Sequence, residues 1–132
     1  MPCIFCDLIS RQAESVLWSN GRFSIILDTK PINPGHVLVV PNRHEPELFS
    51  LSDEEYADLF GLIKKISPIL KDSSSARRIG VAVEGFGVPH THIHLVPVNA
   101  GNELNPTRAK ELTREEALFW ERKLKEAFSN LR

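Results

Sequence analysis

Three histidines at alternate positions are the residues of this chain most suited to chemistry. His90, His92 and His94 lie in the string Pro-His-Thr-His-Ile-His-Leu-Val-Pro. Residues i, i+2 and i+4 of a β-strand share one face, so a strand here would project all three imidazoles to the same side. Ile93 and Leu95 would then face the opposite side. The pattern predicts a functional face of imidazoles backed by an apolar face on the core.

Several roles fit such a face. A chance cluster on a solvated strand is improbable, because only five histidines occur in 132 residues. Two of the imidazoles could share a zinc ion through their ring nitrogens. One neutral imidazole could instead act as a nucleophile, since its ordinary pKa is about 6.5, with its neighbours binding an anion or moving protons. Strand geometry alone leaves the metal site and the nucleophile open.

The segment before the triad reads Val-Glu-Gly-Phe-Gly-Val-Pro over residues 83–89. Gly85 and Gly87 allow tight turns and close approach of the backbone. A loop of this kind can direct backbone N–H groups at a phosphate. It can equally be a plain turn between two strands, and both interpretations stay open at this point.

Five segments with strand character must position these residues. Asn20-Gly21, between two apolar runs, predicts a hairpin because both residues tolerate a positive φ. The strands are grouped together rather than alternating with helices, which favours an α+β fold with a mostly antiparallel sheet. The predicted strands cover residues 15–19, 22–28, 36–41, 77–83 and 90–97.

Two further segments have helix character. Ser52 with Glu55, and Thr113 with Glu116, each form the sequence of a capping box at the start of a helix. Pro68 is expected to kink or end the first helix near Ser67, because proline removes a backbone donor. The loop over residues 99–107 contains no recognisable functional motif.

Length and composition narrow the class of protein. A chain of 132 residues fits a single domain, predicted here over residues 1–132. Sixteen Lys and Arg against 17 Asp and Glu give a net charge of −1, which argues against a partner that is a nucleic-acid polymer. No apolar run is long enough to span a membrane. Without a signal-peptide pattern, and with only two cysteines, we expect a cytoplasmic protein.

The sequence resembles the histidine triad (HIT) family. The family signature alternates histidine with apolar residues, and the matching string here is His-Thr-His-Ile-His-Leu-Val. Further matches lie in family order: Cys3-Ile-Phe-Cys6, Leu27-Asp28, the segment from Pro31 to His36, and Val37-Leu-Val-Val-Pro41 followed by His44. The resemblance covers about residues 3–97, and the loop and helix over 98–132 are not diagnostic.

The resemblance implies a five-stranded antiparallel sheet with two main helices, and a homodimer whose sheet has ten strands. It implies a hydrolase or nucleotidyl transferase acting at the α-phosphate of a purine nucleotide, either a phosphoramidate or a dinucleoside polyphosphate. His92 matches the nucleophile that becomes a nucleotidyl-histidine. His90 and His94 match flanking positions that orient it and contact the phosphate or leaving group.

The resemblance also implies a nucleotide site. Asp28 matches the position that holds ribose hydroxyls, and Phe5, Ile26 and Thr29 match positions around the base. Many members carry Gly-Gln-Ser or Gly-Gln-Thr before the triad, whereas Phe86 and Gly87 occupy the Gln and hydroxyl positions here. Two side-chain donors are thereby lost. We expect phosphate binding to depend more on the backbone N–H groups of Gly87 and Val88.

Cys3 and Cys6 form a Cys-x-x-Cys motif. Alone, the motif fits a zinc half-site, a redox pair or two inactive thiols. Some histidine triad proteins pair such cysteines with two histidines, which match His44 and His90 here, so the resemblance implies a structural zinc and no organic cofactor. His36 is interpreted as a strand-start histidine with structural hydrogen bonds.

Two other functions stay open. One is a nucleotide-binding module with weak catalysis, which the residues Phe86 and Gly87 suggest. The other is a hydrolase whose metal is held by the triad itself.

Overall fold

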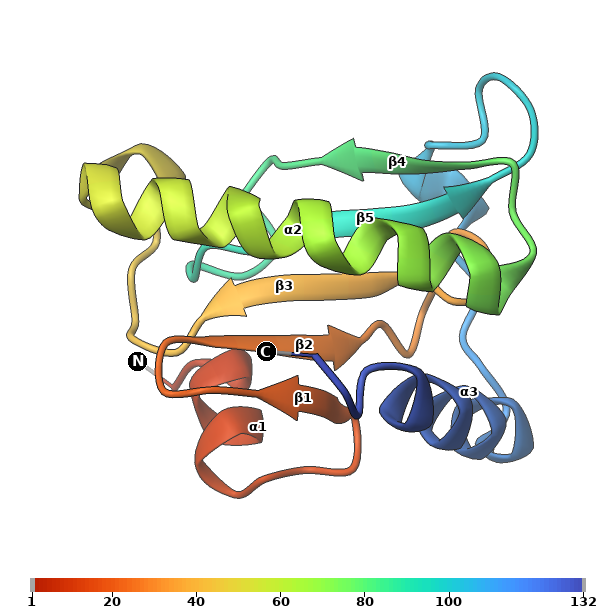
Figure 1. Ribbon diagram of the computed structural model, residues 1–132, viewed down its shortest axis with the longest axis horizontal. Helices are drawn as coiled ribbons and strands as arrows, with labels where there is room; N and C mark the ends of the chain where they lie inside the picture. The colour runs from red at the N-terminus through yellow and green to blue at the C-terminus, as the bar shows by residue number, and fades with distance from the viewer. Residues whose placement is uncertain (1, 132) are drawn as a thin grey trace.

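A five-stranded antiparallel sheet forms the centre of the protein (Figure 1). The computed structural model describes residues 2–131, so both end residues of the predicted 1–132 domain lie outside the described chain. The strand order is β1-β2-β3-β5-β4, which confirms the predicted sheet and fold class. The strands are β1 Val16–Ser19, β2 Phe23–Leu27, β3 Val37–Pro41, β4 Arg78–Ala82 and β5 Ile93–Val98.

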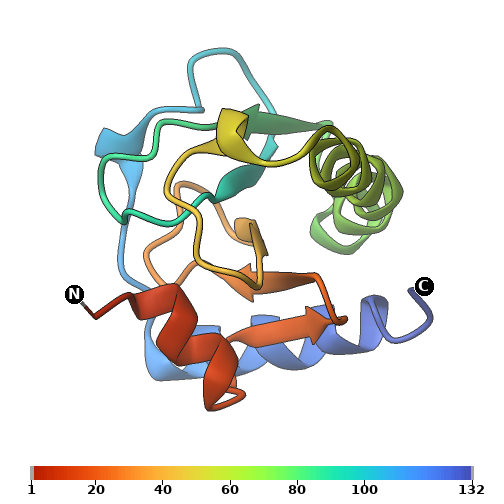
Figure 2. The same ribbon diagram turned by 90° about the vertical axis from the view of Figure 1, so that its left-hand side faces the viewer.

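The two faces of the sheet have different neighbours. One face, which includes Ile25, Val39 and Ile93, packs against α2 Asp53–Ser74 and α3 Arg114–Ala127 in the main core. The other face carries Ile26 and a smaller apolar cluster with α1 Ile4–Ser10. Figure 2 shows α1 and α2 on different sides of the strands. Leu38 of this second face pairs in register with His94, so the histidines lie on the face away from α2.

The hairpin between β1 and β2 is present, but its turn differs from the expected one. Neither Asn20 nor Gly21 has a positive φ. Instead, the Asn20 side-chain oxygen accepts hydrogen bonds from the backbone N–H groups of Arg22 (2.8 Å) and Phe23 (2.7 Å). Asparagine closes this turn by side-chain hydrogen bonding rather than by a left-handed backbone.

The predicted strand over residues 90–97 begins only at Ile93. The backbone N–H and the hydroxyl of Thr91 both donate to the carbonyl oxygen of Glu45, each at 2.7 Å. The residues before Ile93 therefore bond to the loop after β3 and leave the sheet ladder. For this reason His90 does not share the direction of His92 and His94.

Both predicted capping boxes form, at Ser52 with Glu55 and at Thr113 with Glu116. Of the two expected effects of Pro68, a kink or an end near Ser67, the end is wrong, because α2 continues through Pro68 to Ser74. Pro68 lies on the exposed side, where water can bond the carbonyl that proline leaves unpaired. The residue after the helix, Ser75, caps it with a left-handed φ of 58°.

The short helix α1 was not predicted. It has seven residues, so the apolar spacing of Phe5, Leu8 and Ile9 spans less than two turns and is too short to mark a helix in the sequence. Among residues 2–131, none of the helices is long and apolar enough to cross a membrane.

Candidate functional site

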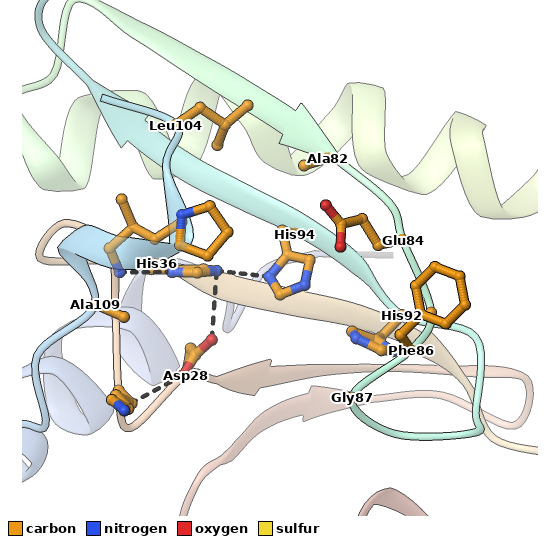
Figure 3. A pocket seen from close by; sticks show the side chains of 14 residues that line it. Asp28, His36, Ala82, Glu84, Phe86, Gly87, His92, His94, Leu104 and Ala109 are labelled. Atoms are coloured by element: carbon orange, nitrogen blue, oxygen red, sulfur yellow. Dashed lines mark hydrogen bonds and ion pairs between the residues drawn. The ribbon is translucent and has the colours of Figure 1, made fainter. Parts of the chain in front are cut away.

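A cavity of about 340 Å³ opens on the sheet face that carries the histidines (Figure 3). Residues from four parts of the chain line it: the connection from β2 to β3, the end of β4 with the loop after it, the triad at the start of β5, and the segment after β5. The lining residues are Asp28, Lys30, Ile32, His36, Ala82, Glu84, Gly85, Phe86, Gly87, His92, His94, Leu104, Pro106 and Ala109.

A chain of hydrogen bonds sets the proton positions of two cavity histidines. The backbone N–H of Ile32 donates to His36 Nδ1 at 3.0 Å, so the proton of His36 lies on Nε2. His36 Nε2 lies 2.9 Å from His94 Nδ1 and therefore donates to it. His94 consequently carries its own proton on Nε2. The backbone of Ile32 thus makes His94 a hydrogen-bond donor at its far ring nitrogen.

Both histidines of this pair are neutral. Burial lowers the pKa of His36 to about 3, and the neighbouring His94 adds to the effect. Burial, with a contribution from His92, lowers the pKa of His94 to about 4. A neutral pair keeps the tautomers described above at neutral pH.

Asp28 lies beside this pair, with one carboxylate oxygen 3.4 Å from His36 Nε2. The contact is not an ion pair, because burial keeps His36 uncharged. The other oxygen of Asp28 accepts from the backbone N–H of Lys30 at 2.9 Å. Burial raises the pKa of Asp28, while that N–H and His92 oppose the rise. The carboxylate is positioned as a fixed acceptor at the end of the cavity.

His92 has the opposite tautomer to His94. Its Nδ1 lies 2.7 Å from the carbonyl oxygen of His90, and a carbonyl only accepts, so Nδ1 is the protonated nitrogen. In the neutral ring, Nε2 of His92 therefore has the free electron pair. The ring is 7% exposed and packs edge-on against Phe5, with the ring centroids 5.1 Å apart. This geometry makes His92 the cavity histidine best prepared as a nucleophile.

His90 points into a different cluster. Its Nε2 lies 2.7 Å from the carbonyl oxygen of Pro41, so Nδ1 is unprotonated. That Nδ1 lies 3.3 Å from Cys3 Sγ and 3.5 Å from Cys6 Sγ. His44 Nδ1 lies 3.5 Å from Cys6 Sγ, and the four ligand atoms all lie within 4.8 Å of one another.

This cluster fits a tetrahedral metal. Zinc with bonds of about 2.3 Å to sulfur and 2.0–2.1 Å to nitrogen holds its sulfur and nitrogen ligands about 3.6 Å apart. The observed separations of 3.3–3.5 Å are close to that value. Burial lowers the pKa of His90, which keeps the ring in the neutral form that binds metal.

The residues predicted around a base do not line the cavity. Phe5 and Ile26 belong to the smaller apolar cluster against α1, and so does Val88, which was predicted to bind the phosphate through its backbone N–H. Thr29 is exposed, and its carbonyl accepts a hydrogen bond from the backbone of Leu112. Of the predicted nucleotide-site residues and triad histidines, the cavity brings together Asp28, Gly87, His92 and His94.

Several lining residues were missed from the sequence. His36 was interpreted as structural, although it lies between Asp28 and His94. The sequence signal that could have indicated a site role for His36 was its place in the segment from Pro31 to His36, which matches the family pattern. No sequence signal marked Leu104, Pro106 or Ala109, which reach the cavity because the segment after β5 folds back over it.

Comparison with known proteins decides the family. The HIT domain family matches residues 10–101. The chain belongs to the histidine triad family. The matched range begins later than the predicted 3–97, so Cys3 and Cys6 lie before it.

Three relatives are similar to the chain, and the names of two of them state an activity. An uncharacterised HIT-like protein of Mycobacterium tuberculosis is 30% identical over 87% of this chain and 84% of its own length. Adenosine 5′-monophosphoramidase hnt1 of Schizosaccharomyces pombe is 32% identical over 74% of each chain. The asymmetrical bis(5′-nucleosyl)-tetraphosphatase of the same yeast is 41% identical over 64% of this chain and 49% of its own.

Solved HIT structures share the fold. A hypothetical histidine triad nucleotide-binding protein of Sulfolobus tokodaii has a TM-score of 0.80 and 26% identity, covering 98% of this chain and 93% of its own. A zinc-bound histidine triad family protein of Mycobacterium smegmatis has a TM-score of 0.79 and 28% identity, covering 99% and 96%.

Proposed function

We propose that this HIT protein is a hydrolase or nucleotidyl transferase that acts at the α-phosphate of a purine nucleotide through a covalent nucleotidyl-His92. The observation that carries the proposal is the 2.7 Å hydrogen bond from His92 Nδ1 to the carbonyl oxygen of His90. In the neutral ring this bond places the free electron pair on Nε2 of His92, in a cavity that also holds Asp28 and His94.

The reaction has two displacements. Nε2 of His92 forms a bond to the α-phosphorus, and the bond to the leaving group breaks, with its electron pair going to the leaving group. Water or another acceptor then attacks the phosphorus and releases the nucleotide, which returns the electron pair to Nε2. Throughout, Nδ1 keeps its proton and its bond to His90, which stabilises the positive charge on the substituted ring.

Other cavity groups have supporting roles in this proposal. His94 donates from Nε2 to a phosphoryl oxygen or to the leaving group. Asp28 accepts hydrogen bonds from ribose hydroxyls, for which an acceptor-only carboxylate is suited. The backbone N–H groups of Gly87 and Val88 are assigned to the phosphate. Donors aimed at the charge of the transition state supply much of the acceleration in sites of this type.

Cys3, Cys6, His44 and His90 would hold a structural zinc, as their separations and the zinc-bound relative support. When bound, the metal would fasten α1 to the loop after β3 and to the segment before β5. The ring of His90 would then bind the zinc, while its backbone carbonyl accepts the hydrogen bond from His92.

Two alternatives have specific support. A nucleotide-binding module is favoured by Phe86, which is 93% exposed at the position of the usual glutamine and offers no donor. A metal held within the cavity has the nearby set Asp28, His36 and His94. Against it, His36 Nε2 and His94 Nδ1 are already joined by a hydrogen bond of 2.9 Å.

We further propose a cytoplasmic homodimer. β4 forms one edge of the sheet, and Val81 on it is 47% exposed, so a second copy could extend the sheet there to ten strands. Cys3 and Cys6 form no disulfide, as a reducing compartment would require. Molar mass in solution tests the dimer.

Release of AMP tests the proposed reaction. Adenosine 5′-phosphoramidate and diadenosine tetraphosphate are incubated with wild type and with His92→Ala, each with and without chelator. The proposal expects release that needs His92 and tolerates brief chelation. Tight AMP binding with no release from either substrate would establish the binding module. Release abolished at once by chelator while Cys6→Ser still retains the metal would establish a cavity metal.

A further inference from the structure

The charges around the cavity do not suit a polyphosphate. The charged side chains that line it are Asp28, Glu84 and Lys30, so carboxylates outnumber cations by two to one. His36 and His94 add no positive charge, because burial keeps both neutral. Arg108, on the segment that closes the cavity, donates instead to Asn33 at 2.9 Å and lies 3.9 Å from Glu103.

Glu84 lies three residues before Gly87, whose backbone N–H is assigned to the phosphate in the proposed function. It precedes Gly85, whose φ of 89° turns the backbone sharply there. Figure 3 shows its carboxylate directed from the loop into the cavity, on the side of His94. Asp28 is already bonded by the Lys30 N–H at the other end. Glu84 therefore faces the space beyond the α-phosphate, where a leaving group must lie if Asp28 holds the ribose.

Building on the proposed function, we infer that Glu84 selects substrates by the charge of the leaving group, favouring nucleoside phosphoramidates whose amine carries a cationic group over dinucleoside polyphosphates. A polyphosphate leaving group would bring several negative charges close to the Glu84 carboxylate, and Lys30 is the one cationic side chain among the lining residues. An amine with a second, protonated nitrogen would instead form an ion pair with Glu84. Glu84 is a specificity residue in this account and takes no part in bond making.

The step balances with one water. His92 Nε2 bonds to phosphorus as the P–N bond breaks, and the electron pair of that bond goes to nitrogen. The nitrogen takes a proton from water and leaves as an amine. The remaining hydroxide displaces His92 from phosphorus and completes the nucleoside monophosphate. The second ammonium group of the amine stays protonated throughout, so Glu84 contacts a positive charge before and after the step.

The test compares three AMP phosphoramidates of similar size, made from ethylenediamine, propylamine and glycine, together with diadenosine tetraphosphate. These amines make the leaving group cationic, neutral and anionic in turn. The value of kcat/KM is measured for wild type, for Glu84→Gln, and for Glu115→Gln as a charge-matched control on the exposed start of α3.

Wild type is expected to prefer the ethylenediamine compound over the propylamine compound by roughly fivefold, the effect of an exposed ion pair of about 1 kcal/mol. In Glu84→Gln this ratio falls to near one, and kcat/KM for the tetraphosphate rises relative to that for the propylamine compound. Glu115→Gln keeps the wild-type ratios. If the ratio of the ethylenediamine to the propylamine compound is unchanged in Glu84→Gln while release still depends on His92, the role of Glu84 is overturned. The proposed function would stand in that case. Absence of His92-dependent release from every substrate would overturn the proposed function and this inference with it.

Discussion

The carbonyl oxygen of His90 lies 2.7 Å from Nδ1 of His92, so His90 contacts both the cavity and the cluster with the two cysteines. The ring of His90 faces Cys3 and Cys6, whereas its backbone sets the tautomer of the proposed nucleophile. A second hydrogen bond, from His90 Nε2 to the carbonyl of Pro41, fixes the ring to the end of β3. The Cys3, Cys6, His44 and His90 cluster and the cavity are therefore adjacent, and His90 links them.

Loss of the proposed zinc is expected mainly to lower the thermal stability of the fold. Cys6→Ser should lower zinc from one per chain to a small fraction, and should lower Tm by several degrees, because a structural zinc contributes folding free energy. The value of kcat should fall as well, since His90 would hold His92 less firmly. Metal analysis and thermal unfolding measure these effects, with Asp7→Asn on the exposed side of α1 as the control. Unchanged zinc content in Cys6→Ser would refute the assigned ligands.

Substitutions of His36 test the hydrogen bond that sets the tautomer of His94. His36→Gln can place its amide N–H near the Nε2 position and still donate to His94. His36→Asn places the amide near the Nδ1 position and cannot reach it. Losing this donor should lower kcat about 10- to 100-fold in His36→Asn, the cost of one buried hydrogen bond left unmade, with KM for the nucleotide little changed. Equal activity of the two variants would show that the donation does not matter.

Stability should fall in mild acid. His36 and His94 have folded-state pKa values of about 3 and 4, well below the ordinary value near 6.5. Between these limits the unfolded chain binds more protons than the folded one, so the free energy of unfolding decreases as the pH falls from about 6.5 to 4. Urea unfolding at pH 7, 5.5 and 4.5 measures the slope. His36→Gln should reduce it, and a slope that is the same in that variant would contradict the role of His36.

The missing side-chain donors can be restored. Phe86 is 93% exposed, and a Cβ at Gly87 would meet no atom within 4 Å, so Phe86→Gln with Gly87→Ser should fold normally. If these donors reach the phosphate, kcat should rise by about tenfold or more, because one such donor is worth roughly 10²-fold in comparable sites. Single-turnover AMP release measures the effect. A double variant no faster than wild type would show that the backbone of this loop already suffices.

The sheet and the capped helices could be predicted because their signals are local. Alternating apolar residues, Asn20-Gly21 and the two capping boxes each act within a few positions of the chain. The triad could also be predicted from the sequence, but the direction of the His90 side chain could not. That direction depends on Thr91 bonding to Glu45, a contact between segments 46 positions apart. The same holds for His36, Glu84 and Leu104, which become cavity residues only when distant segments meet.

The measurement that tests the account most directly is isolation of the covalent intermediate. Wild type and His92→Ala are mixed with adenosine 5′-phosphoramidate, quenched within one turnover, and analysed by intact mass and peptide mapping. The account predicts one adenylyl group on the peptide that contains His92, stable in base and lost in acid, and absent from His92→Ala. Turnover by His92→Ala at the wild-type rate, or an adenylyl group on another residue, would contradict it.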